Sequence, residues 1–177
     1  MHRHLALIAT VVFTAAPALA LDMPMRKAGL WELKMSFEGR NLPVQVMKHC
    51  TDAATDKLMN ANFGGSVEQA CSKQDVTKTG TGFVIDAVCK FGEMTTTSHS
   101  VVSGSFDSAY KIETSSTRQG GPQIPGMPAG TATKMTIDAK WLGACPAGQK
   151  PGDVTMANGM TMNVLDIQKM RPPAPGR

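Results

Sequence analysis

Residues 30–38, Leu-Trp-Glu-Leu-Lys-Met-Ser-Phe-Glu, decide the fold of this chain. From Trp31 to Phe37 every odd-numbered residue is apolar, and from Glu32 to Glu38 every even-numbered residue is polar. A period of two is typical of a β-strand that buries one face and exposes the other to water. The stretch therefore predicts a half-buried antiparallel strand, with Trp31 as a core anchor.

A second stretch with the same alternation lies about 100 residues later in the chain. In residues 134–141 the side chains of Met135, Ile137, Ala139 and Trp141 fall on one face and polar side chains on the other. Between the two stretches, segments rich in Thr, Val and Ser are separated by Gly-containing turns, which is typical of further strands. The expected strands are residues 30–38, 42–50, 71–79, 82–91, 94–104, 106–115 and 131–142.

Several of these segments carry more specific expectations. Leu42, Val44, Val46 and Cys50 would share one face of the second strand, and the weakly apolar residues 94–104 would form an edge or solvent-exposed strand. The Pro- and Gly-rich residues 119–130 exclude regular structure and predict a long loop.

One short helix is expected after the second strand. Thr51 would be its N-cap, Asp52 would complement the positive end of its dipole, and it would run to about Met59 before Asn62 to Gly65 end it. Residues 154–170 are expected to form a short strand or helix. The fold class predicted is mainly β: a curved, half-barrel-like antiparallel sheet of about seven strands with one short helix.

The first 20 residues have the pattern of a signal peptide. Arg3 supplies a positive charge, residues 5–16 form a short apolar run, and Ala18-Leu19-Ala20 fits a cleavage site. No later segment approaches the roughly 20 apolar residues that a membrane-spanning helix needs. We therefore expect a single β-rich domain at residues 21–170 and a disordered tail at 171–177, in a protein released into the periplasm or secreted.

The four cysteines are even in number, which in an exported chain predicts disulfide bonds. Four cysteines allow three connectivities. Cys71 and Cys89 lie symmetrically about Gly80, so a three-residue hairpin loop would set them opposite each other. This symmetry favours Cys71–Cys89, which leaves Cys50–Cys145.

Several motifs together resemble a known family. They are Gly29-Leu30-Trp31-Glu32, Cys50-Thr51-Asp52, the spaced Cys71 and Cys89, Trp141-Leu142-Gly143-Ala144-Cys145-Pro146-Ala147-Gly148, and Pro151-Gly152-Asp153. In order and spacing, over about residues 28–153, they look like the domain of unknown function 3617 family of small exported bacterial proteins. The resemblance implies an exported compartment, a cysteine pattern and a β-rich fold. It implies no activity.

Composition argues against several classes of function. The formal net charge is +4 and the basic residues are scattered, whereas nucleic-acid-binding proteins cluster them on one face. The only histidines after residue 20 are His49 and His99, and no nucleophile elbow, phosphate-binding loop or zinc-protease motif occurs. We expect no enzymatic activity, no cofactor and no nucleic-acid partner.

Two binding functions remain as hypotheses. If the concave face of the sheet is not filled, it would offer a mostly apolar pocket for a small apolar ligand or an apolar segment of an envelope protein. The expected lining is Trp31, Leu33, Val44, Met135 and Ile137. The alternative is a Cu(I) site, because thioether sulfur is a soft ligand. Its expected ligands are Met156, Met160 and Met162, with His49 or His99 as helpers.

Overall fold

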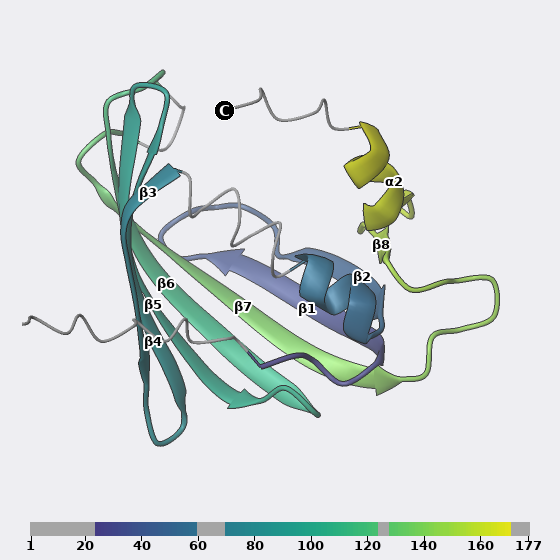
Figure 1. Cartoon of the computed structure of the whole chain (residues 1–177). Helices are drawn as coiled ribbons and strands as arrows, with labels where there is room; N and C mark the ends of the chain where they lie inside the picture. The colour runs from purple at the N-terminus through teal and green to yellow at the C-terminus, as the bar shows by residue number, and fades with distance from the viewer. Residues whose placement is uncertain (1–23, 60–69, 124–127, 171–177) are drawn as a thin grey trace, which may run out of the picture.

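The protein is built on one antiparallel sheet of nine strands (Figure 1). The computed structural model describes residues 24–59, 70–123 and 128–170. The strands are β1 (Gly29–Phe37), β2 (Gln45–Thr51), β3 (Cys71–Lys78), β4 (Gly82–Phe91), β5 (Met94–Ser105), β6 (Ala109–Gln119), β7 (Ala132–Gly143), β8 (Asp153–Thr155) and β9 (Thr161–Asn163). Residues 53–59 are helical, and a second helix, α2 (Val164–Met170), follows β9.

The order of strands in the sheet is β3-β4-β5-β6-β7-β1-β2-β8-β9. Strands β3 to β7 follow one another as neighbours, and β1 then pairs with β7, so the two cleanest amphipathic strands of the sequence lie side by side. Figure 1 shows the sheet curving strongly, with the helical residues 53–59 over the part formed by β1 and β2. The predicted curved, mainly β fold is confirmed, with two short strands more than expected.

The core lies on the face of the sheet that carries Trp31, which we call the inner face. Residues paired across strands share a face, so this face is defined by the register of the ladders. Trp31, Leu33, Tyr110 and Ala139 form its buried cluster. Tyr110 stacks on Phe106 with ring centroids 4.7 Å apart and tilts against Trp31 at 5.5 Å. The prediction that Trp31 anchors the core is confirmed.

The second strand starts later than expected, and the residues expected to form its apolar face do not lie on the inner face of the sheet. The strand begins at Gln45, and Leu42 and Val44 precede it and are exposed. Pairing with β1 sets Met47 opposite Leu33 and His49 opposite Trp31. Odd-numbered residues of β2 therefore lie on the inner face, and Val46 and Cys50 lie on the other face.

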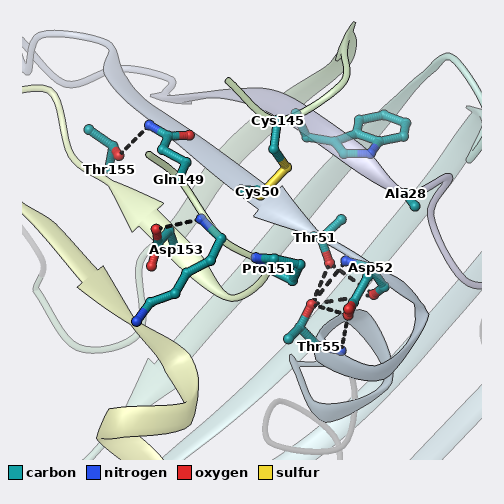
Figure 2. Close-up of a disulfide and its surroundings, with 12 residues drawn as sticks. Ala28, Cys50, Thr51, Asp52, Thr55, Cys145, Gln149, Pro151, Asp153 and Thr155 are labelled. Atoms are coloured by element: carbon teal, nitrogen blue, oxygen red, sulfur yellow. Dashed lines mark hydrogen bonds between the residues drawn. A yellow bond between two sulfur atoms is a disulfide. The ribbon is translucent and has the colours of Figure 1, made fainter. Parts of the chain in front are cut away.

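The first helix is capped by Asp52, and the prediction of Thr51 as N-cap is wrong. Thr51 is the last residue of β2, and the helix begins at residue 53. Asp52 Oδ1 accepts hydrogen bonds from the backbone N–H and the hydroxyl of Thr55, both at 2.8 Å (Figure 2). The Thr55 hydroxyl also contacts the Asp52 backbone nitrogen at 3.0 Å, so the two residues satisfy each other's free groups reciprocally.

Residues 94–104 were expected to form an edge strand or a solvent-exposed strand, and the second alternative is confirmed. They belong to β5, whose side chains are mostly partly or fully exposed, and which lies between β4 and β6 and not at an edge. Strand β6 starts at Ala109 and not at residue 106, because Ser105 to Ser108 form a turn closed by the Ser108 N–H and the Ser105 carbonyl. The described residues between β6 and β7 contain no strand or helix, as the Pro and Gly content predicts.

Both expected disulfides are present. Cys145, after β7, is bonded to Cys50 on β2, and the Cα atoms are 5.5 Å apart (Figure 2). Cys71 is bonded to Cys89 across the β3–β4 hairpin. The symmetry about Gly80 does not hold along the ladder, because Lys78 pairs with Phe83. An irregularity between Cys71 and Lys73 shifts the register by one residue and restores the pairing of the two cysteines.

Several expectations concern residues outside the described part of the chain. They are the signal peptide at residues 1–20, cleavage near Ala20, the end of the first helix at 62–65 and the tail at 171–177. Residues 154–170, expected to be a short strand or helix, form the end of β8, then β9 and α2. Among the helices of the described ranges, none has the length and apolarity to cross a membrane.

Candidate functional site

A row of apolar side chains crosses the inner face through five neighbouring strands. Phe83, Val102, Ile112, Ile137 and Met35 are successive partners in the ladders from β4 to β1. Val102 is buried, and the other four are half-buried. Side chains in register on one face lie within contact distance of their neighbours. We call these five residues the apolar row.

The buried cluster lies beside the apolar row, toward one end of the inner face. Leu33, Tyr110 and Ala139 lie one step along the strands from this row, and Ile112 and Ile137 pack against them. Trp31 is 0% exposed, and its indole N–H donates to the Lys27 carbonyl at 2.8 Å. This end of the inner face is therefore closely packed, and its buried indole N–H has a hydrogen-bond partner. We call the four residues of the buried cluster the packed floor.

The other end of the inner face is rich in hydroxyl groups. Ser100 and Thr114 are paired across β5 and β6, and their hydroxyls are 2.9 Å apart. Further along lies a hollow of about 180 Å³ lined by Met94, Thr96, Ser116, Arg118, Pro128, Thr131 and Thr133. Arg118 is buried there, and its Nη1 donates to the carbonyl of Pro122. The inner face thus changes from apolar to polar along the strand direction.

A buried polar cluster lies beside Trp31, where the helical residues 53–59 meet the sheet. Asp56 is 0% exposed, and its carboxylate accepts from the Arg26 backbone N–H at 2.8 Å and from Arg26 Nε at 2.7 Å. The same guanidinium reaches His49 Nδ1 at 3.5 Å and Met59 Sδ at 3.7 Å, and it lies over the Trp31 ring at 6.0 Å. Arg26 therefore joins the segment before β1 to the helix and to β2.

The surroundings of this cluster shift two titratable groups. Burial, and then the Arg26 charge, lower the pKa of His49 from 6.5 to about 4, so its imidazole is neutral at neutral pH. Burial raises the pKa of the Tyr110 hydroxyl, with smaller opposing effects from Arg26. The cluster holds a hydrogen-bonded ion pair and a neutral histidine, and its contacts join three separate segments of the chain.

Four of the five residues expected to line a pocket lie on the inner face. Met135 and Ile137 are half-buried on β7, whereas Trp31 and Leu33 belong to the packed floor. Val44 is 54% exposed and precedes β2, so it is separate from the others. The alternation of single strands missed Phe83, because β4 has apolar residues on both faces. It missed Val102 and Ile112 because β5 and β6 are too rich in Thr and Ser to show a clean period.

The candidate metal ligands come together without their expected helpers. Met156, Met160 and Met162 all belong to the β8–β9 hairpin at one end of the sheet. His99 lies on β5, separated from the hairpin by β6, β7, β1 and β2, and its Nδ1 contacts Asp86 Oδ1 at 2.8 Å. His49 pairs with Val154 of β8, but its Nδ1 faces Arg26. No group of three His, Cys, Asp or Glu side chains that could hold a metal occurs within the described ranges.

The opposite, outer face carries a hollow of different character. It measures about 420 Å³, and among its lining residues are Glu32, Lys34, Lys111, Asp138 and Lys140. Glu32 pairs with Lys140 and Lys34 with Asp138 across β1 and β7, so opposite charges face each other. Alternating charges of this kind are typical of a solvated sheet face. We therefore assign the candidate site to the inner face.

The fold and the inner face define a class of protein. It is a small domain built on one open β-sheet and cross-linked by two disulfides, and one face of the sheet changes from apolar to polar along the strands. The chain belongs to the family described as protein of unknown function (DUF3617), whose family model matches residues 26–145. The match begins at Arg26 and ends at Cys145, so it includes all four cysteines and Asp56. No curated protein and no solved structure matches the chain significantly.

Proposed function

We propose that this protein acts in the periplasm, or outside the cell, as a binding module for a small apolar ligand, without catalysing a reaction. The observation that carries the proposal is the apolar row. Four of its five side chains are half-buried on a curved sheet face, with a rigid floor at one end. Concave, mostly apolar surfaces with a few polar groups are typical of ligand sites.

The polarity gradient suggests which ligands fit. An apolar body would lie over the apolar row, and a polar end would reach the hollow of about 180 Å³ near Thr96, Ser116 and Arg118. Apolar contact would supply most of the binding free energy, at roughly 25 cal/mol per Å² buried. Hydroxyl and guanidinium groups would orient the polar end.

Two observations support the proposed compartment. The structure contains two disulfides and no free cysteine within the described ranges, and disulfides persist in oxidising compartments. Residues 1–20 have the charge, apolar run and small residues of a signal peptide.

N-terminal sequencing of the protein from its own cell envelope tests the compartment, and the sequence should begin at Leu21. Retention of Met1 in a cytoplasmic protein would contradict the proposal.

Native mass spectrometry of the same preparation tests the binding function. We expect a bound mass of a few hundred daltons that is lost on unfolding. The stripped protein should also raise the fluorescence of N-phenyl-1-naphthylamine, an apolar probe. Failure of the parent protein to carry a ligand and to bind the probe would contradict the proposal.

A matched pair of variants locates the site. Ile112→Thr removes apolar surface from the inner face on β6, and Val101→Thr makes a similar change on the outer face of neighbouring β5. We expect weaker probe binding for Ile112→Thr and unchanged binding for Val101→Thr. Equal effects of the two changes would place the probe elsewhere.

A further inference from the structure

The β8–β9 hairpin carries three methionines within seven residues, at positions 156, 160 and 162. Its pairing runs Asp153 with Asn163, Val154 with Met162 and Thr155 with Thr161. The turn is closed by two backbone hydrogen bonds, from Met156 N to the Met160 carbonyl at 2.8 Å and from Gly159 N to the Met156 carbonyl at 2.9 Å. Met156 and Met160 are therefore neighbours across the hairpin.

The register places all three methionines on one face of the hairpin. The hydroxyls of Thr155 and Thr161 are 2.9 Å apart, which fixes the face on which those two side chains lie. Side chains alternate along a strand, so Met156 and Met160 lie on the opposite face, together with Met162. Val154, the partner of Met162, also pairs with His49 of β2. The methionine face is thus continuous with the inner face of the sheet.

The turn between the strands is held in one conformation. Asn158 Oδ1 accepts from the Met160 N–H at 3.0 Å, which is an Asx-type contact that stabilises turns. Gly159 has φ +82°, a left-handed conformation that favours glycine. The two sulfur-bearing side chains at the turn are therefore presented from a fixed backbone.

Packing alone does not account for these methionines. Methionine usually fills gaps in a core, yet Met160 is 53% exposed, and Met156 and Met162 are half-buried. From Val154 to Leu165 the chain contains no charged residue and no histidine or cysteine. The ligands offered by this face are thioethers, which select soft monovalent ions and leave hard cations without oxygen donors.

We propose that the methionine face of the β8–β9 hairpin is a binding site for Cu(I), with the sulfur atoms of Met156, Met160 and Met162 as ligands. This site is separate from the apolar row and lies beyond residues 26–145 that match the family. A neutral set of thioethers adds no charge of its own, so the bound ion keeps its single positive charge. Ag(I), which has the same charge and a similar preference for sulfur, serves as a stable probe.

The first experiment uses the unmodified protein, with its disulfides intact and its methionine methyl groups labelled with ¹³C. Addition of Ag(I) should shift three methyl resonances, those of Met156, Met160 and Met162, and saturate at one ion per chain. Methyl groups of Met35, Met94 and Met135 on the rest of the inner face should not move. No shift, or equal shifts for all methionines, would overturn the proposal.

The second experiment measures Cu(I) transfer from a chromophoric chelator under anaerobic conditions. The parent protein should take up one Cu(I), and the triple variant Met156→Leu, Met160→Leu, Met162→Leu should take up none, because leucine keeps the volume but has no sulfur. The matched control, Met35→Leu, Met94→Leu, Met135→Leu, should bind like the parent. Uptake by the hairpin variant equal to that of the parent, or its loss in the control variant alone, would overturn the assignment.

Discussion

Arg26 and Asp56, 30 residues apart in sequence, form a two-point contact in which the backbone N–H and the Nε of Arg26 both donate to one buried carboxylate. The contact fixes the direction in which the chain enters β1 and holds the helical residues 53–59 against the inner face. Neither side chain is more than 8% exposed. The ion pair thus has a structural role at the edge of the candidate site.

Removing one partner of this pair should destabilise the protein strongly. Asp56→Ala leaves the Arg26 charge buried without its carboxylate, and we expect a loss of about 3 to 5 kcal/mol in the free energy of unfolding. Urea denaturation measures it. The control is Asp75→Ala, which breaks the exposed Lys73–Asp75 pair and should cost about 0 to 1 kcal/mol. Similar losses for the two variants would show that the Arg26–Asp56 pair is not a buried clamp.

Gly29 should tolerate no side chain, because neighbouring atoms fill the space that a Cβ atom would need. It has φ +132°, and a Cβ atom would lie 2.2 Å from the Gly143 carbonyl oxygen and 2.6 Å from Trp141 Nε1. Gly29→Ala should therefore force β1 and β7 apart at their paired ends. Gly39 also has a positive φ, +71°, but nothing lies within 4 Å of its missing Cβ.

The two glycine variants separate the close contact from backbone strain. Gly39→Ala should lower the free energy of unfolding by about 1 to 2 kcal/mol, the cost of a left-handed alanine. Gly29→Ala should lower it by clearly more, and thermal unfolding monitored by circular dichroism compares them. A smaller loss for Gly29→Ala than for Gly39→Ala would contradict the tight packing of β1 on β7.

The two disulfides should differ in their contribution to stability. Cys50 and Cys145 are 95 residues apart, and Cys71 and Cys89 are 18 apart. A cross-link restricts the unfolded chain more when it closes a longer loop, so the chain-entropy relation gives about 5 kcal/mol for the first and about 3 kcal/mol for the second. Denaturation of the two double Cys→Ala variants, each with the other disulfide intact, tests this order. The reverse order would mean that native-state effects dominate.

The parts of the fold that sequence predicts are those in which one strand has one buried face. Strands β1 and β7 alternate cleanly because water lies on one side and the Trp31 cluster on the other. The sequence does not predict the inner face of β2, because the side chains on that face include the polar His49. Its partner Arg26 comes close to it only in the folded state. Strands β8 and β9 have three residues each, which is too short for a period to show.

The cysteine pairing could be predicted, but its geometry could not. Symmetry about Gly80 gives the right partners, although most of the β3–β4 ladder is offset from it by one residue. The irregularity at Ser72 that corrects the offset depends on both strands and leaves no mark in either segment. The Arg26–Asp56–His49 cluster was missed for a similar reason, since its members come from three separate segments.

Stability should fall as the pH drops below the ordinary pKa of histidine. In the folded protein the pKa of His49 is lowered from 6.5 to about 4, mainly by burial and then by Arg26. Above pH 6.5 the imidazole is neutral in both states, whereas between 6.5 and 4 only the unfolded chain binds the proton, so unfolding is favoured. We expect a loss of about 2 kcal/mol between pH 7 and pH 5.

One variant assigns this pH dependence to a single side chain. His49→Gln removes the titrating group and should flatten the stability profile in this window. The lowered pKa values of Asp52 and Asp153, held down by hydrogen bonds from Thr55 and from the Lys150 backbone, act only below their ordinary value of 3.8. Urea midpoints measured from pH 7 to pH 4.5 therefore isolate His49, and a profile for His49→Gln as steep as that of the parent would contradict its burial beside Arg26.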